Sequence, residues 1–206
     1  MKNQGYCLPM LLFIVLTGLG WVLPMRSVRA AEVVRVNVSH DKGHYRIGAE
    51  AFVALPPDRV KAGIVDVDNL ERLSSDVLES RLVERKAGNR LLARMDLRSC
   101  ILFFCLERTL NQTVIIKEWE VVFIVHPAKN GFRSGWVRWK IFAAEQGTRV
   151  IYSSELVPDF WIPPMIGPFL LKGKFHDNTA EVMEKMEEQF ANGDRKPKFQ
   201  SVGSAD

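Results

Sequence analysis

Residues 158–190 read PDFWIPPMIGPFLLKGKFHDNTAEVMEKMEEQF, and this stretch decides the architecture of the chain. Four prolines interrupt its first third and exclude a regular helix or a central strand there. After Phe169 an amphipathic helix is predicted to run to about Ala191, where Asn192-Gly193 ends it. One largely apolar stripe runs along this helix, formed by Phe175, Thr179, Val182, Met183, Met186 and Phe190. The chain therefore ends on a long helix with one face to bury.

Strands precede this helix. Residues 44–54 alternate between apolar and polar side chains, which is the period of a half-buried strand. Pro57 and Asp58 then favour the start of a short helix over residues 60–65, and residues 66–75 are predicted as a second short helical piece. Further strands are predicted at residues 77–86, 90–97, 100–110, 114–126, 132–144 and 148–157.

The order of these elements restricts the architecture. The predicted order is a strand, two short helices, a run of strands and one long helix. A highly curved antiparallel sheet with the last helix across its concave side is consistent with this order. The inward side chains of such a wrap enclose either a packed core or a cavity, and the sequence leaves both open.

The N-terminal residues have the pattern of a secretory signal peptide: Lys2, an apolar run over residues 8–23, and Val28-Arg29-Ala30 before Ala31. The run is shorter than the roughly 20 residues that a spanning helix needs. We therefore expect cleavage after Ala30 and export to the periplasm, with an uncleaved inner-membrane anchor as the alternative. The expected organisation is a signal peptide at 1–30, an extended lead-in at 31–43, one domain at 44–192 and a disordered tail at 193–206.

Removing the leader changes the charge argument. The whole chain carries 28 Lys+Arg against 24 Asp+Glu, a net charge of +4. The leader holds Lys2, Arg26 and Arg29 and no acidic residue, so 25 basic residues face 24 acidic ones in the remainder, a net of +1. No basic run remains, and nucleic acid is not an expected partner.

Two cysteines, Cys100 and Cys105, follow the leader. If residues 100–110 form one strand, the two Cα atoms lie roughly 16 Å apart. A disulfide needs a separation below about 7 Å. We therefore predict that these cysteines do not pair with each other and serve as small apolar side chains.

Three motifs resemble the START-like (SRPBCC) superfamily, above all its polyketide cyclase and coenzyme Q-binding branch. They are ALPPDRV at residues 54–60, GTRVIY at residues 147–152 and PDFWIPPMIGP at residues 158–168. The resemblance covers about residues 45–190 and implies an α+β, helix-grip fold, in which a curved antiparallel sheet wraps around a long C-terminal helix and two short helices follow the first strand. It also implies a cavity for lipids, sterols, quinones or polyketides, in a superfamily with few enzymes. Lys61 departs from the pattern, since many relatives carry an aromatic residue there.

Motifs for catalysis are missing from the sequence. It has no metal-ligand spacing among His40, His44, His126 and His176, no nucleophile elbow, and no phosphate-binding glycine loop outside the leader. His176, beside Asp177, is expected at the surface. No catalytic residue, metal or cofactor is expected.

We predict non-catalytic binding, with possible roles in transport, of a lipophilic ligand such as a lipid, quinone or terpenoid. The alternatives are a polyketide cyclase-type enzyme and an interaction module with a filled interior. The predicted binding residues are Leu92, Arg94, Phe104, Val122, Trp139, Tyr152, Ser154, Trp161 and Ile166.

The segment Phe160–Leu171 has a separate prediction. It is strongly apolar, and Lys172 and Lys174 follow it, a composition that suits transient docking on an anionic membrane surface. The alternative is that the segment packs beneath the sheet and the helix.

Overall fold

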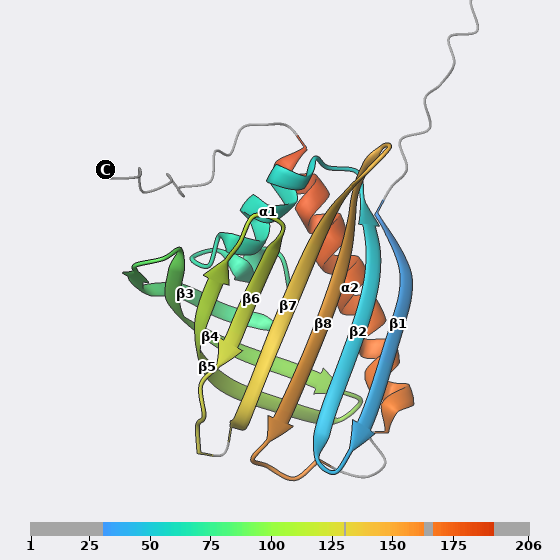
Figure 1. Cartoon of the computed structure of the whole chain (residues 1–206). Helices are drawn as coiled ribbons and strands as arrows, with labels where there is room; N and C mark the ends of the chain where they lie inside the picture. Colours follow the sequence, from blue (N-terminus) through green and yellow to red (C-terminus); the bar gives the residue numbers. More distant parts are fainter. Residues whose placement is uncertain (1–30, 130, 163–166, 192–206) are drawn as a thin grey trace, which may run out of the picture.

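The structure of the chain is a computed structural model that describes residues 31–129, 131–162 and 167–191 (Figure 1). The expected leader, the expected tail, Ile166 and the Asn192-Gly193 helix stop lie outside the described residues. The elements, in chain order, are β1 Glu32–Asp41, β2 His44–Val53, α1 Pro57–Val65, the short 3-10 helix η1 Leu70–Arg72, β3 Val77–Lys86, β4 Arg90–Ile101, β5 Phe104–Ile116, β6 Glu120–Val125, β7 Phe132–Ala144, β8 Gly147–Pro158 and α2 Pro168–Phe190.

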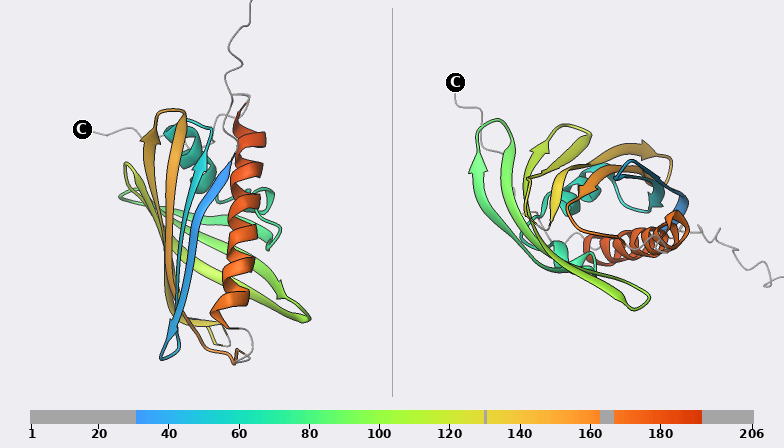
Figure 2. Two further views of the ribbon diagram at one scale, coloured as in Figure 1. Left: turned by 90° about the vertical axis from the view of Figure 1, so that its right-hand side faces the viewer. Right: turned by 90° about the horizontal axis from the view of Figure 1, so that it is seen from below.

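All eight strands form one antiparallel sheet in the order β1-β2-β8-β7-β6-β5-β4-β3. The sheet curls strongly, and α2 crosses its concave side (Figure 2). α1 and η1 lie at one end of this wrap. The predicted α+β, helix-grip fold is therefore confirmed. The segment expected as a lead-in contributes β1, so the two short helices follow the second strand of the sheet.

Two strand predictions were wrong. Residues 100–110 are not one strand, because β4 ends at Ile101 and β5 begins at Phe104 after a tight turn. Residues 114–126 are divided in the same way by a turn at residues 117–119. Neither turn contains the glycine or asparagine that usually marks a hairpin, and Leu102 adopts a positive φ of 56° that apolar residues seldom show.

The C-terminal half of α2 is the part of the helix that packs into the core. Met183, Met186 and Phe190 are buried against side chains of the sheet and of α1. Gly63 of α1 permits this packing, since a Cβ there would lie 3.2 Å from the Phe190 ring and 3.5 Å from Met186. The N-terminal half of α2 has no fully buried residue and borders the site described below.

The GTRVIY motif has a structural explanation at its first two residues. Gly147 has a φ of 152°, and a Cβ at this position would lie 2.3 Å from the Val53 carbonyl oxygen. Thr148 is fully buried, and its hydroxyl donates a hydrogen bond to the Leu55 carbonyl at 2.6 Å. The pair therefore lets the start of β8 lie directly against the end of β2.

Neither α1 nor α2 is both long enough and apolar enough to cross a membrane.

Candidate functional site: an apolar cavity between sheet and helix

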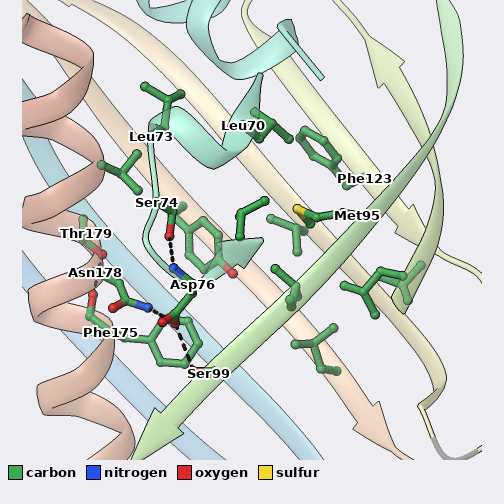
Figure 3. A pocket seen from close by; sticks show the side chains of 18 of the residues that line it. Leu70, Leu73, Ser74, Asp76, Met95, Ser99, Phe123, Phe175, Asn178 and Thr179 are labelled. Carbon is green, nitrogen blue, oxygen red and sulfur yellow. Dashed lines mark hydrogen bonds between the residues drawn. The ribbon is translucent and has the colours of Figure 1, made fainter. Parts of the chain in front are cut away.

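A cavity of about 360 Å³ lies between the concave face of the sheet, η1 and the N-terminal half of α2. Pockets that hold small lipophilic molecules measure about 300–1,000 Å³. Most of the wall is apolar, and Leu70, Met95, Phe123 and Phe175 are among the residues that form it (Figure 3).

The alternation of each strand decides which side chains reach the cavity. On β4 the odd-numbered residues from Met95 to Ile101 line it, and on β5 the even-numbered residues from Leu106 to Gln112 do so. Phe123 and Val125 come from β6. The wall also includes Val137, Trp139, Tyr152 and Leu156 of β7 and β8.

Of the nine predicted binding residues, Trp139 and Tyr152 line the cavity. Leu92 and Arg94 do not, because they have the opposite parity on β4, and Val122 has the opposite parity on β6. These three side chains therefore belong to the other face of the sheet.

The remaining predicted residues lie elsewhere. Phe104 and Ser154 have the inward parity of their strands but are not part of the cavity wall. Trp161 is 71% exposed, and Ile166 lies outside the described residues. Lys61, the departure from the superfamily pattern, reaches away to donate to the Glu118 carbonyl at 3.0 Å.

Tyr152 is the phenol of the cavity wall. Its ring packs edge-on against Trp139, with 4.9 Å between the ring centroids. Burial raises the pKa of the Tyr152 phenol, and the nearby Ser154 hydroxyl opposes part of that rise. The two groups do not form a hydrogen bond, because Ser154 Oγ has no partner among the described residues. Tyr152 is therefore a neutral phenol and a poor general base at neutral pH.

A polar cluster around Asp76 closes the edge of the cavity between α2 and the β3–β4 side of the sheet (Figure 3). Asp76 Oδ1 accepts a hydrogen bond from Lys174 Nζ at 2.7 Å. Its Oδ2 accepts from Asn178 Nδ2 at 2.7 Å and from the Ser99 hydroxyl at 2.9 Å. This carboxylate therefore ties the N-terminal half of α2 to the sheet.

We expect Asp76→Asn to weaken this tie, because the amide nitrogen cannot accept and the partly buried Lys174 ammonium loses its counter-charge. The free energy of unfolding should fall by about 1–3 kcal/mol. Hydrogen exchange should quicken in the first half of α2 more than in the second. The matched control is Asp177→Asn, whose carboxylate is exposed and lies 3.3 Å from Nδ1 of His176. An equal effect of both variants would contradict the role of Asp76.

Glu181 forms a second tie, one turn further along α2. It accepts hydrogen bonds from the Ser75 backbone and hydroxyl, both at 3.0 Å, and from Lys185 Nζ at 2.7 Å. Burial alone would raise the pKa of Glu181, but these hydrogen bonds and the Lys185 charge lower it overall.

The lowered pKa of Glu181 predicts a pH dependence. A carboxyl whose pKa is lower in the folded state stabilises that state above its ordinary pKa of 4.5, and this contribution is lost as pH falls through the folded value. Thermal unfolding followed from neutral to acidic pH should therefore show a smaller loss of Tm in Glu181→Gln than in the wild type. Identical slopes for the two proteins would remove Glu181 from this account.

Most polar residues of the wall are not among the residues predicted from sequence, and two of them, Gln112 and Arg108, come from β5. Gln112 is 2% exposed, and its Nε2 has no partner among the described residues. Arg108 lies four residues nearer the hairpin tip, and its guanidinium stacks on Phe160 with 4.9 Å to the ring centroid. A sequence signal existed for Gln112, since it interrupts the apolar inward series Leu110, Val114 and Ile116.

The prediction for the cysteines was wrong. Cys100 and Cys105 form a disulfide, with 4.0 Å between their Cα atoms. The reason is the turn at Leu102-Phe103, which places the two cysteines opposite each other in adjacent antiparallel strands instead of along one strand. The disulfide therefore staples a hairpin tip whose Leu102 and Phe103 are 75% and 92% exposed.

Metal binding by the described residues would require a group of ligand side chains placed close together. Among residues 31–129, 131–162 and 167–191, no group of three or more His, Cys, Asp or Glu side chains is placed to hold a metal ion. His176 is exposed, with its Nδ1 3.3 Å from Asp177.

No protein-family model matches this sequence, and no curated protein matches it. Solved structures do match. The Zhui aromatase/cyclase from Streptomyces sp. R1128 has a TM-score of 0.57 at 13% identity, over 73% of this chain and 98% of its own. A START superfamily protein from Mycobacterium smegmatis has a TM-score of 0.59 at 16% identity, over 71% and 99%. A STAR-related lipid transfer protein from Xanthomonas axonopodis has a TM-score of 0.55 at 13% identity, over 78% and 98%.

These similarities define the class of the protein at the level of fold. The chain has the START-like, helix-grip fold, as its sequence motifs predicted. Identities of this size establish a shared architecture, whereas function has to be argued from the site.

Proposed function

We propose that this protein binds a lipophilic small molecule in the cavity between its sheet and α2, and carries that molecule without chemical change. The observation that carries the proposal is the cavity itself, with its volume of about 360 Å³ and its largely apolar wall. The proposed ligand is a lipid, a quinone or a terpenoid. A lipid transfer protein and an aromatase/cyclase are among the proteins of similar structure, which supports a lipophilic ligand.

The energetics suit a carrier. Each methylene group withdrawn from water contributes about 0.8 kcal/mol. A ligand chain enclosed between α2 and the sheet is therefore strongly favoured over the same chain in water, and no catalytic side chain is needed. The predicted leader supports a setting in the periplasm, where a lipophile has to cross an aqueous space.

A cyclase-type enzyme is the second candidate, and one observation favours it: Asp76 and Lys174 place a carboxylate and an ammonium in the cavity wall. Lys174 Nζ and Asp76 Oδ1 form an ion pair at 2.7 Å. Such a pair serves to hold α2 in place more readily than to donate or accept a substrate proton. We therefore propose a ligand carrier rather than an enzyme.

Native mass spectrometry of the exported protein, purified without detergent, tests the proposal. We expect a fraction of the protein to carry an additional mass that organic solvent extracts as an unmodified lipophile. An extracted molecule that has been cyclised or dehydrated relative to a supplied precursor would favour the enzyme. A bare protein that also fails to take up any added lipophile would contradict both.

We also propose that the end of the cavity near the start of α2 docks on an anionic membrane. Trp161 and Phe169 of the predicted membrane segment are 71% and 85% exposed. The tip of the β4–β5 hairpin, which carries Leu102 and Phe103, lies toward the start of α2 (Figure 2) and adds apolar surface there. Ile101 of β4 and Leu171 of α2 both line the cavity. Apolar side chains of this kind insert at the lipid headgroup boundary.

Liposome flotation with vesicles rich in phosphatidylglycerol measures this docking. The combined substitution Trp161→Ala, Phe169→Ala should release most of the bound protein, and adding Phe103→Ala should release the rest. Phe142→Ala, which removes a partly exposed aromatic from β7, is the control and should float like the wild type. Unchanged flotation of the triple variant would end the membrane proposal.

A further inference from the structure

Gln112 is one of two residues of the cavity wall, with Arg108, that have a buried side-chain nitrogen without a hydrogen-bond partner among the described residues. Its side chain is 2% exposed, and its amide nitrogen has no acceptor among the described residues. The residues paired with it in the two adjacent strands, Ala93 and Val125, are apolar. A buried donor without a partner costs about 1–3 kcal/mol, so its presence in a cavity wall requires an explanation.

The charged side chains around Gln112 indicate whether a ligand group beside it is charged or neutral. Of the residues that the structure describes, three with charged side chains line the cavity, and two of them, Asp76 and Lys174, neutralise each other. The third, Arg108, is four residues away on β5, which is about 13 Å along a strand. A carboxylate placed at Gln112 would therefore be buried without a counter-charge, which is strongly unfavourable. An uncharged oxygen has no such cost.

We propose that Gln112 is a ligand-recognition residue that donates a hydrogen bond to the carbonyl oxygen of an uncharged lipophile. The ligand class is a long-chain ketone, ester or quinone, which enters the cavity with its oxygen first. Arg108 lies nearer the hairpin tip, so any charged group of the ligand stays at that end. This inference rests on the proposed function, because it requires the cavity to hold a lipophile.

The test compares two probes of equal chain length, 2-undecanone and undecane, by their displacement of the fluorescent dye anilinonaphthalene sulfonate from the full mature chain. The wild type should bind the ketone about tenfold more tightly than the hydrocarbon. Gln112→Met keeps the length of the side chain and removes the amide. This variant should lose the preference for the ketone, bind undecane as before, and unfold at a Tm no lower than that of the wild type. Asn111→Met, on the exposed face of the same strand, is the control and should keep the preference.

The outcomes separate the inference from the proposed function. Equal binding of both probes by the wild type, or a retained ketone preference in Gln112→Met, overturns the role of Gln112 and leaves the carrier standing. A marked loss of Tm in Gln112→Met would show that the amide stabilises the fold, and would also overturn the role of Gln112 in ligand recognition. Displacement of the dye by neither probe overturns both.

A second inference rests on a different observation, the surroundings of Glu187 on α2. Its Oε1 accepts a hydrogen bond from the Ala54 backbone at 2.6 Å, and its Oε2 accepts from the Ala31 backbone nitrogen at 3.2 Å. Ala31 packs against the core. Among the residues that the structure describes, no cation forms an ion pair with this half-buried carboxylate.

Ala31 is also the residue that follows the predicted cleavage site. Hydrolysis of the Ala30–Ala31 bond by a signal peptidase consumes one water, leaves a carboxylate on the leader and frees the Ala31 amine, which takes up a proton at neutral pH. We infer that the new ammonium group forms an ion pair with Glu187, so that processing completes the contact between β1 and α2.

Enzymatic acetylation of the α-amine tests this pairing, because it removes the charge and keeps an N–H donor. In a chain that begins at Ala31, acetylation should lower Tm by about 2–4 °C, the change expected for roughly 1 kcal/mol. It should have no effect in Glu187→Gln. Equal shifts in both backgrounds, or an exported chain whose sequenced N-terminus is not Ala31, would overturn the inference.

Discussion

Gly147→Ala should destabilise the protein by about 3–5 kcal/mol, the sum of backbone strain and overpacking. The φ of 152° at Gly147 disfavours any residue with a side chain. The added methyl would also meet the Val53 carbonyl oxygen at 2.3 Å and the Ala54 Cα at 3.0 Å. Both are backbone atoms, so β2 and β8 would have to separate. Equilibrium unfolding in urea, with Tm as a second measure, gives the size of the loss.

Gly48→Ala is the matched control for Gly147→Ala. Gly48 also lies in a strand of the same sheet, but a Cβ there has no atom within 4 Å and its φ is not in the strained range. The control should change stability by less than about 0.5 kcal/mol or increase it slightly. A similar loss in both variants would show that the effect does not come from the close approach and the strained φ at Gly147.

Met95→Trp should reduce the affinity for a lipophilic ligand about 100-fold, as expected if the larger side chain displaces some three or four methylene groups. Met95 projects from β4 into the cavity beside Phe123 (Figure 3). The indole ring of the introduced tryptophan would therefore fill part of the proposed ligand-binding cavity. The folded protein should remain at least as stable, because filling a cavity adds apolar contacts. Dye displacement by 2-undecanone measures the affinity, and Tm measures the stability.

Met95→Leu is the control for Met95→Trp. It conserves volume and apolar character at the same position, and should retain ligand binding. Unchanged affinity in Met95→Trp, in a protein that unfolds normally, would place the ligand somewhere other than this cavity.

Alternation and turn residues made much of the sheet predictable. Residues 132–144 match β7 at both ends, and β8 and α2 begin and end within a residue or two of the prediction. The hairpin at Leu102-Phe103 was missed because its turn is made of two apolar residues inside an apolar run. That one error also produced the wrong prediction for the cysteines, since the distance argument assumed an unbroken strand.

The site was less predictable than the fold for a related reason. Leu91 and Leu92 are both apolar, so the sequence does not show which of them faces the concave side, and the wrong choice assigns Leu92 and Arg94 to the cavity. Trp139 and Tyr152 do line the cavity, and around Trp139 the sequence of β7 alternates clearly between apolar and basic residues. The Asp76 tie joins residues about a hundred positions apart, and no local pattern reveals such a contact.

The most direct test of the central claim is an experimental structure of the mature chain crystallised with 2-undecanone. We predict continuous density for the ligand between α2 and strands β4–β7, in contact with Met95 and Phe123, with its oxygen beside Gln112. Density for the ligand only on the outside of the sheet, with the interior closed by the protein's own side chains, would contradict the account.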